Sequence, residues 1–236
     1  MPHVIVVQHE EGEGPGALAA ALGAAGLDLR LVRTWLRDEV PEAPGEASGV
    51  IALGGGMSVA TPPTAPPLLR EVALLRSACA ANLPVLGLCL GAQILSLSLG
   101  GTVARMPRRE LGFLRVRLTP AAQDDALFAS VPSSIVAFHW HEDAFTLPPG
   151  ATALASSTAT PLQAFRAGAA WGIQFHPEVT QAVLAALVAS GPNDVREAGA
   201  DPAQLIEAAE RELPRMDSWR LPLFARWAAL VVGERR

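Results

Sequence analysis

The chain has 236 residues, half of them hydrophobic, and its 18 basic and 23 acidic side chains give a formal net charge of −5. This length is enough to bury a substantial core, and we expect one α/β domain over residues 1–236. The acidic balance and the lack of any cluster of basic residues exclude a protein that tracks a phosphate backbone, so no nucleic acid is expected as a partner.

Apolar runs in the sequence are short. None reaches the roughly 20 residues that span a bilayer, so no membrane is expected as a partner. The two cysteines, Cys79 and Cys89, are too few for a disulfide framework and suit a reducing compartment. We therefore expect a cytoplasmic protein, in which Cys79 packs within a helix.

Short apolar runs alternate with helix-like segments in the first 90 residues. The predicted elements in chain order are a strand at 4–8, a helix at 16–26, strands at 29–32 and 50–53, a helix ending near 81 and a strand at 83–88. This alternation is typical of a mostly parallel sheet with helices on both faces. Ligands of such sheets bind at the carboxyl ends of the strands.

The rest of the chain mixes strands with helices. Strand-like pieces at 114–118 and 134–138 are expected to add antiparallel strands to one edge of the sheet. The elements expected after them are a strand at 171–175, a helix at about 179–189, a break at 191–194, and two helices at 202–212 and 218–232. The last two form a C-terminal helical extension, about 200–236, which we expect to pack on its own domain; docking of a partner is the alternative.

Cys89 lies between two glycines, directly after an apolar strand and before a helix-like stretch. Gly-x-nucleophile-x-Gly in this context is typical of a nucleophile elbow, a sharp turn that presents the reactive side chain to solvent. The N-terminal end of the following helix faces the sulfur and favours the thiolate, which is the attacking species. A buried cysteine beside close-packed glycines is the alternative.

A nucleophilic cysteine needs a base within hydrogen-bond reach, and the base needs a third group to orient it. His176 follows the predicted strand at 171–175, at the sheet edge where Cys89 is expected, and Glu178 comes two residues later. Because Pro177 restricts the local turn, the Glu178 carboxylate is placed to hold the imidazole and select its tautomer. These residues predict a Cys-His-Glu triad; a strand-end histidine beside a solvated glutamate is the alternative.

The segment 138–143 carries a second candidate site. His139 and His141 alternate along the chain, so on a strand they project to one face and are spaced to share a zinc or manganese ion with Asp143. A catalytic metal needs further ligands, and only two other histidines remain unassigned. We expect no metal and no cofactor, and metal-dependent hydrolysis at His139 and His141 is the lesser alternative.

Three segments together resemble the class I, or triad, glutamine amidotransferases. Residues 87–93 are similar to the family's nucleophile segment, 172–178 to its histidine and glutamate segment, and 53–59 to its glycine loop. The matched core is about 50–190, and stand-alone members that resemble the glutaminase domain of GMP synthase are the nearest match. The resemblance implies a flavodoxin-like, doubly wound, mostly parallel mixed sheet with a nucleophile elbow. One departure is Gly56, where the family usually has proline.

The resemblance implies how such an enzyme works. Cys89 would attack the side-chain amide of glutamine to give a thioester, while His176 moves protons and Glu178 orients His176. The negative oxygen of each intermediate would lie between the backbone amides of Gly55 and Leu90. Ammonia would be released.

Further residues are substrate-binding candidates through the same resemblance. They are Gly54 of the glycine loop, Gln93 after the nucleophile, and the polar run His141, Glu142 and Asp143. A role for Glu110 in the family site and a plain surface charge are equally good interpretations of that residue.

The predicted function is hydrolysis of the glutamine amide, and the substrate is a small molecule. The chain contains no synthetase domain that consumes ammonia, so it either supplies a separate synthetase subunit or acts alone. Cleavage of a γ-glutamyl peptide or conjugate by the same triad is the main alternative, because the residues do not separate the two substrates.

Overall fold

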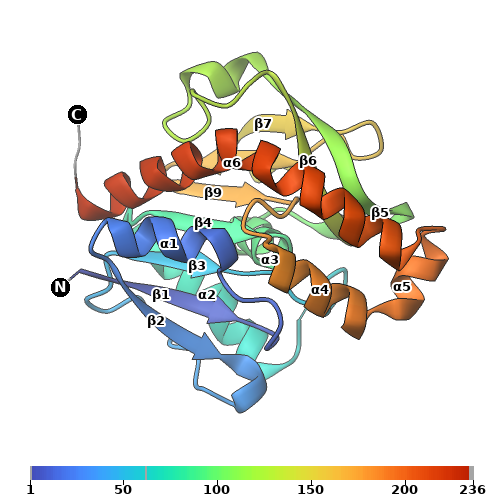
Figure 1. Cartoon of the computed structure of the whole chain (residues 1–236). Helices are drawn as coiled ribbons and strands as arrows, with labels where there is room; N and C mark the ends of the chain where they lie inside the picture. Colours follow the sequence, from blue (N-terminus) through green and yellow to red (C-terminus); the bar gives the residue numbers. More distant parts are fainter. Residues whose placement is uncertain (1, 62, 234–236) are drawn as a thin grey trace.

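The computed structural model describes residues 2–61 and 63–233 of the chain. Nine strands form one mixed sheet in the order β2-β1-β3-β4-β9-β8-β7-β5-β6 (Figure 1). Five neighbouring strands are parallel: β2 (Asp28–Arg33), β1 (His3–Gln8), β3 (Gly49–Ala52), β4 (Val85–Leu88) and β9 (Ala170–Ile173). The others extend one edge in antiparallel fashion: β8 (Ala164–Ala167), β7 (Thr152–Ser156), β5 (Val103–Leu118) and β6 (Ser134–Phe145). The predicted fold class is confirmed.

Helices cover both faces of the sheet (Figure 1). Their bounds are α1 (Gly16–Ala24), α2 (Pro66–Ala80), α3 (Leu90–Ser98), α4 (Gln181–Ser190), α5 (Pro192–Glu197) and α6 (Pro202–Val232), with single 3₁₀ turns at Thr34–Leu36 and Pro120–Asp124. None of the described helices is both long and apolar enough to cross a membrane.

Alternation along the strands produces two hydrophobic cores. In β1, Val4 and Val6 join the core under α1, α4 and α6, while Ile5 and Val7 join the core under α2 and α3. Both faces of the central strands are therefore apolar, and for this reason the strands appear in the sequence as uninterrupted hydrophobic runs. Cys79 lies on α2 and packs against the second core, as predicted. Burial raises the pKa of its thiol to about 11.

Strands β5 and β6 are longer than the sequence indicated. We expected strands at 114–118 and 134–138, but β5 spans Val103–Leu118 and β6 spans Ser134–Phe145. In β6 the buried face continues through His139, His141 and Asp143, so polar side chains occupy positions where apolar ones would have marked a strand. The polar run His141, Glu142 and Asp143, named above as a substrate-binding candidate, is therefore part of a strand.

The C-terminal segment forms one helix rather than two. Helix α6 runs through Pro214 and Pro222, each of which removes a backbone hydrogen bond at a cost of about 3 kcal/mol. A continuous buried stripe that includes Trp219, Phe224 and Trp227 packs against the sheet and against α1 and α4. Burial of three large aromatic side chains offsets the two prolines. The expected break at 191–194 is also partly helical, because α5 begins at Pro192.

Candidate active site

Cys89 lies at the turn between β4 and α3 in the backbone conformation of a nucleophile elbow. Its φ of +48° and ψ of −108° are strained for a residue with a side chain. The flanking glycines make the turn possible. A Cβ atom on Gly91 would lie 2.1 Å from the carbonyl oxygen of Ala52. A Cβ atom on Gly87 would lie 2.6 Å from the carbonyl oxygen of Gly91. Only glycine fits at either position without movement of the backbone.

The side chain of Cys89 is more buried than the elbow pattern predicted. We expected it to project into solvent, but only 5% of the residue is exposed. The carbonyl oxygen of Trp140 on β6 lies 3.8 Å from the sulfur, and the amide nitrogen of Gln174 lies 3.7 Å from it. These segments cover the elbow, so the sulfur is reached through two cavities that it lines.

His176 and Glu178 form a buried pair just beyond the end of β9. The backbone amide of His176 donates to the carbonyl of Phe138, which ties the segment to β6. The Nδ1 atom of His176 lies 2.8 Å from Oε1 of Glu178, so Nδ1 donates and the carboxylate accepts. The Nε2 atom of the ring is left without a hydrogen-bond partner among the described residues. Nε2 is thus the atom free to exchange a proton.

The charge on His176 is stabilised by its neighbours. Burial alone lowers the pKa of this imidazole, but the Glu178 carboxylate and the Cys89 sulfur outweigh burial and hold the pKa well above its usual 6.5. The three residues of the predicted triad therefore lie together, and their electrostatic interaction favours a protonated imidazole beside the sulfur.

Arg220 of α6 supports the same segment from behind. Its buried guanidinium donates through Nη1 to the carbonyl oxygens of Pro177 and Val179, on either side of Glu178, and its Nε donates to Asp217. Helix α6, which lies outside the family motifs, thus holds the backbone on both sides of Glu178.

The glycine loop after β3 is held by a buried ion pair. The Nδ1 atom of His9 donates to the carbonyl of Gly54 over 2.9 Å, and its Nε2 atom donates to the Glu71 carboxylate, also over 2.9 Å. Both side chains are 1% exposed. Burial lowers the pKa of His9, but Glu71 and the Gly54 carbonyl raise it by more, so the ring is a double donor.

Two further contacts hold this loop on its other side. The Glu10 carboxylate accepts a hydrogen bond from the Gly56 amide at 2.8 Å, and the Ser58 hydroxyl donates to Asp143 on β6 at 2.5 Å. In the described part of the chain, the amides of Gly55 and Leu90 donate to no acceptor. These are the two amides from which an oxyanion hole is expected.

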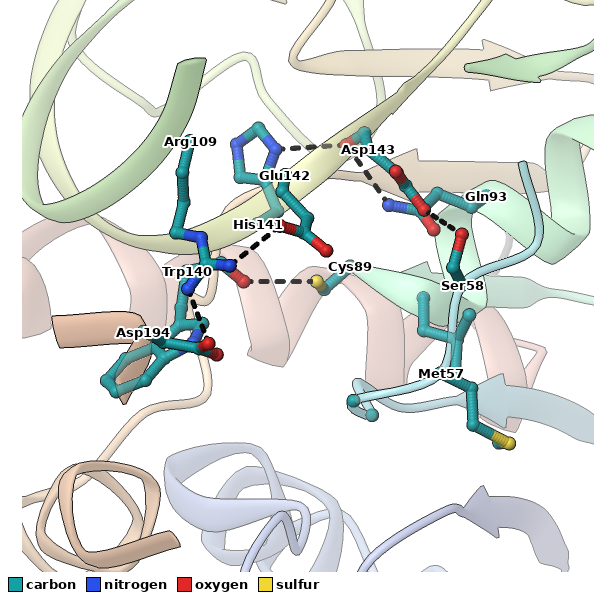
Figure 2. A pocket seen from close by; sticks show the side chains of 13 residues that line it. Met57, Ser58, Cys89, Gln93, Arg109, Trp140, His141, Glu142, Asp143 and Asp194 are labelled. Atoms are coloured by element: carbon teal, nitrogen blue, oxygen red, sulfur yellow. Dashed lines mark hydrogen bonds and ion pairs between the residues drawn. The ribbon is translucent and has the colours of Figure 1, made fainter. Parts of the chain in front are cut away.

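The first cavity beside Cys89 is lined by all the predicted substrate-binding residues except Gly54 (Figure 2). Gln93 donates to the backbone carbonyl of Asp143, which fixes its amide at the cavity wall. Arg109 lies at the mouth, with nitrogens 2.7 Å from the Glu142 carboxylate and 2.6 Å from Asp194 on α5. The predicted residues that line this cavity are Gly55, Cys89, Leu90, Gln93, His141, Glu142 and Asp143.

A comparison with known families decides what this arrangement belongs to. The family model described as glutamine amidotransferase class-I matches residues 16–186 of the chain. The chain belongs to this family. It is an enzyme of the glutamine amidotransferase type, as the sequence predicted.

Relatives of this amidotransferase include stand-alone proteins of similar length. It is 29% identical to the glutamine amidotransferase-like protein YfeJ of Salmonella typhimurium over 81% of this chain and 82% of that one. A glutamine amidotransferase from Thermotoga maritima has a TM-score of 0.87 and 28% identity, with 96% of this chain and 98% of that chain covered. The GMP synthase of Thermomicrobium roseum is 36% identical over 59% of this chain, but the match spans only 25% of the synthase.

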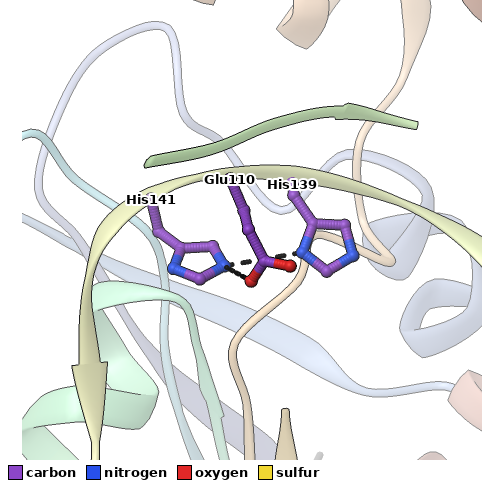
Figure 3. Close-up of side chains that lie close together, drawn as sticks. All are labelled: Glu110, His139 and His141. Atoms are coloured by element: carbon purple, nitrogen blue, oxygen red, sulfur yellow. Dashed lines mark hydrogen bonds and ion pairs between the residues drawn. The ribbon is translucent and has the colours of Figure 1, made fainter. Parts of the chain in front are cut away.

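Glu110, His139 and His141 form a buried polar cluster on β5 and β6 of the amidotransferase (Figure 3). One ligand-type atom from each lies within 4.8 Å of the other two. Asp143, which the metal-site alternative grouped with the histidines, is not in this cluster and instead accepts from Ser58. The Glu110 carboxylate accepts hydrogen bonds from Ser157, Thr160 and Gln163.

The interpretation of Glu110 as a surface charge is wrong, because only 5% of the residue is exposed. Burial raises the pKa of Glu110, but hydrogen bonds from His141 and Ser157 outweigh it and lower the pKa overall. Burial and the neighbouring His141 lower the pKa of His139, which is therefore neutral. The cluster is an internal polar network beneath the substrate cavity.

Sequence reasoning missed His9, Glu71 and Arg220. The available signals were weak: a histidine at the carboxyl end of the first strand, and charged residues within otherwise apolar helical stripes at 71 and 220. A charge on a buried stripe indicates a specific partner, because an unpaired buried charge is costly.

Proposed function

We propose that this amidotransferase hydrolyses the side-chain amide of glutamine through Cys89, His176 and Glu178. The observation that carries the proposal is the orientation of His176. Glu178 occupies its Nδ1 atom, and the unpartnered Nε2 atom belongs to the ring whose charge the Cys89 sulfur stabilises. A base held in this way can give a proton to a leaving amine and then take one from water.

The reaction proceeds in two halves. The Cys89 thiolate attacks the amide carbon and forms a C–S bond; the C–N bond then breaks, and the nitrogen takes a proton from the His176 imidazolium and leaves as ammonia. Water next attacks the thioester while His176 accepts its proton. The C–S bond breaks, and glutamate and the thiolate are released.

The negative oxygen of each tetrahedral intermediate is held by the amides of Gly55 and Leu90. Each donor of this kind contributes on the order of 3 kcal/mol to the transition state. The absence of competing acceptors at these two amides supports the assignment.

The amino-acid end of the substrate binds in the first cavity. Asp143 and Glu142 provide carboxylates for its ammonium group, and Arg109 provides a guanidinium for its carboxylate. Gln93 lies at the cavity wall beside Asp143. Arg109 is tied to Glu142 and Asp194 without substrate, so binding includes an exchange of ion pairs at the mouth.

The fate of the ammonia depends on a partner. The GMP synthases that match this chain are about four times as long as the matched part, and they are named as glutamine-hydrolysing enzymes. We propose that the chain acts as a separate enzyme in a reducing cytoplasm, and that a synthetase subunit is its partner if ammonia is passed on. Two free cysteines are consistent with that setting.

A labelling experiment tests this proposal. A glutamine-derived electrophile should modify Cys89 and leave Cys79 untouched, because burial keeps the Cys79 thiol protonated. Excess glutamine should protect Cys89. Modification of Cys79 alone, or no protection by glutamine, would contradict the proposal.

A further inference from the structure

A groove leads from the Cys89 sulfur to the surface beside the first cavity, with which it shares Gly55, Cys89 and Trp140 as lining residues. Its inner part is a cavity of about 190 Å³ that Cys89 and His176 line. Its outer part has a volume of about 640 Å³ and lies between the β1–α1 loop and α4. The two parts share four lining residues, Glu10, Glu13, Leu187 and Ser190, so they are continuous. We call this the acidic groove.

The acidic groove is on the leaving-group side of the scissile amide. His176 lines it and does not line the first cavity, whereas Gln93 and Asp143 line the first cavity and not the groove. His176 must reach the departing nitrogen to protonate it. The acyl part therefore occupies the first cavity, and anything attached to the nitrogen points into the groove. The Nε2 atom of His176, a residue that is only 2% exposed, has no partner among the described residues and marks that point.

Carboxylates line the groove, and no arginine does. The acidic residues are Glu10, Glu11, Glu13 and Asp194. Glu10 and Asp194 already have partners, the Gly56 amide and Arg109. In the described part of the chain the side chains of Glu11 and Glu13 make no hydrogen bond and no ion pair, so these two carboxylates are available to a ligand.

Glu13 is the carboxylate nearest to the reaction centre. A Cβ atom added to Gly54 would lie 2.6 Å from Oε2 of Glu13 and 3.1 Å from the ring of His176. Glu13 and His176 therefore border the same small space beside Gly54. Burial, opposed by His176 and assisted by Glu10 and Glu178, raises the pKa of Glu13 to about 7. A cation in the groove would favour its ionised form.

The groove is too large for ammonia. One ammonia molecule is about the size of a water molecule, and a cavity of roughly 10–15 Å³ is enough to hold one water. The inner part alone, at about 190 Å³, is far larger, and its walls include the apolar surfaces of Trp140 and Leu187. Such walls suit a chain of methylene groups, and the carboxylates beyond them suit a positive charge at its end.

We propose that, besides glutamine, the site cleaves the γ-glutamyl amide of an aliphatic diamine or polyamine, whose free ammonium group binds Glu13 and Glu11. This rests on the proposed function, since the same thioester forms. The C–N bond that breaks then releases the amine, and its nitrogen takes the proton from His176 in place of ammonia.

Three matched substrates test the proposal with the full-length protein. They are γ-glutamyl-putrescine, which is cationic, γ-glutamyl-pentylamide, its neutral isostere, and γ-glutamyl-aminobutyrate, which is anionic. We expect kcat/KM for the cationic amide to exceed that for the neutral one by about tenfold, with the anionic amide the poorest. Equal or better cleavage of the neutral amide would overturn the proposal. If no amide, glutamine included, is cleaved and Cys89 stays unlabelled, the proposed function itself fails.

Variants locate the charge effect. Glu13→Gln and Glu11→Gln should each lower the ratio of cationic to neutral kcat/KM by about threefold or more. Glu46→Gln removes the same charge from an exposed loop before β3, at the opposite ends of the strands from the groove. This variant should leave the ratio unchanged. Because each ratio compares two substrates of one protein, partial unfolding cancels. An unchanged ratio in both groove variants would overturn the proposal.

Discussion

The buried pair of His9 and Glu71 holds the glycine loop. We expect variants of this pair to show that activity and stability can change independently. In His9→Leu, the Gly54 carbonyl loses its donor and the Glu71 carboxylate, 1% exposed, loses its partner. Leaving one member of a buried pair alone costs about 3–5 kcal/mol of folding free energy. In the double variant His9→Leu/Glu71→Leu no charge is stranded, so most of that stability should return.

Activity should not return with stability. The Gly55 amide, the proposed oxyanion donor, follows Gly54 directly, and neither variant restores the hydrogen bond that fixes Gly54. Because one donor contributes on the order of 3 kcal/mol to the transition state, we expect kcat to fall by about 10- to 100-fold in both variants. KM for glutamine should change by less than about threefold, since this contact acts on the transition state.

Urea unfolding and ammonia-release kinetics measure the two effects on the same preparations. Glu71→Gln is the conservative control, because its amide oxygen still accepts from Nε2 of His9, and it should retain most of kcat. A double variant that regains the wild-type kcat together with its stability would refute the positioning role of His9.

Three further predictions concern the support of the triad and the buried polar network. Arg220→Met should lower kcat by about tenfold and the free energy of unfolding by about 2–3 kcal/mol, because the Pro177 and Val179 carbonyls lose a charged donor. Arg220→Lys should recover part of kcat. An unchanged kcat in Arg220→Met would contradict the supporting role of Arg220. Glu178→Gln should lower kcat by roughly 10²–10⁴-fold with little change in unfolding free energy, and a smaller loss in ammonia release would argue against the orienting role. Finally, the pKa of His139 is lower in the folded state than its usual 6.5, so the stability it contributes is present above that value and is lost as pH falls. His139→Gln should therefore reduce the slope of unfolding free energy against pH by about 1.4 kcal/mol per unit near pH 5, measured by urea titration; an identical slope would show that His139 is not buried as a neutral ring.

The central strands, the elbow turn and the pairing of His176 with Glu178 were predictable because each depends on residues close together in sequence. The turn at Cys89 needs glycine at 87 and 91, because a Cβ atom at either position would clash with the backbone. His176 and Glu178 are two residues apart at a strand end. Local patterns of this kind can be recognised in the sequence without knowledge of the tertiary fold.

The supports of the site depend on long-range contacts to backbone atoms. His9 reaches a carbonyl 45 residues away, and Arg220 reaches one 43 residues away. Every residue carries a carbonyl, so the sequence contains no mark of which one is the partner. The same limit applies to Glu110, which follows two arginines and looks like a surface charge until β5 and β6 enclose it.

The errors in element bounds have related causes. In β6 the inward positions are polar, so the alternation that predicts a strand is hidden by His139 and His141. In α6 the local signal of Pro214 and Pro222 favours a break, and the buried aromatic stripe that overrides it is a tertiary effect.

Trapping the acyl-enzyme tests the central claim most directly. Acid-quenched enzyme with glutamine in excess should yield a γ-glutamyl thioester on the peptide that contains Cys89, detected by mass spectrometry, and Cys89→Ala should yield none and release no ammonia above background. A thioester on Cys79, or ammonia release by Cys89→Ala at the wild-type rate, would contradict the account.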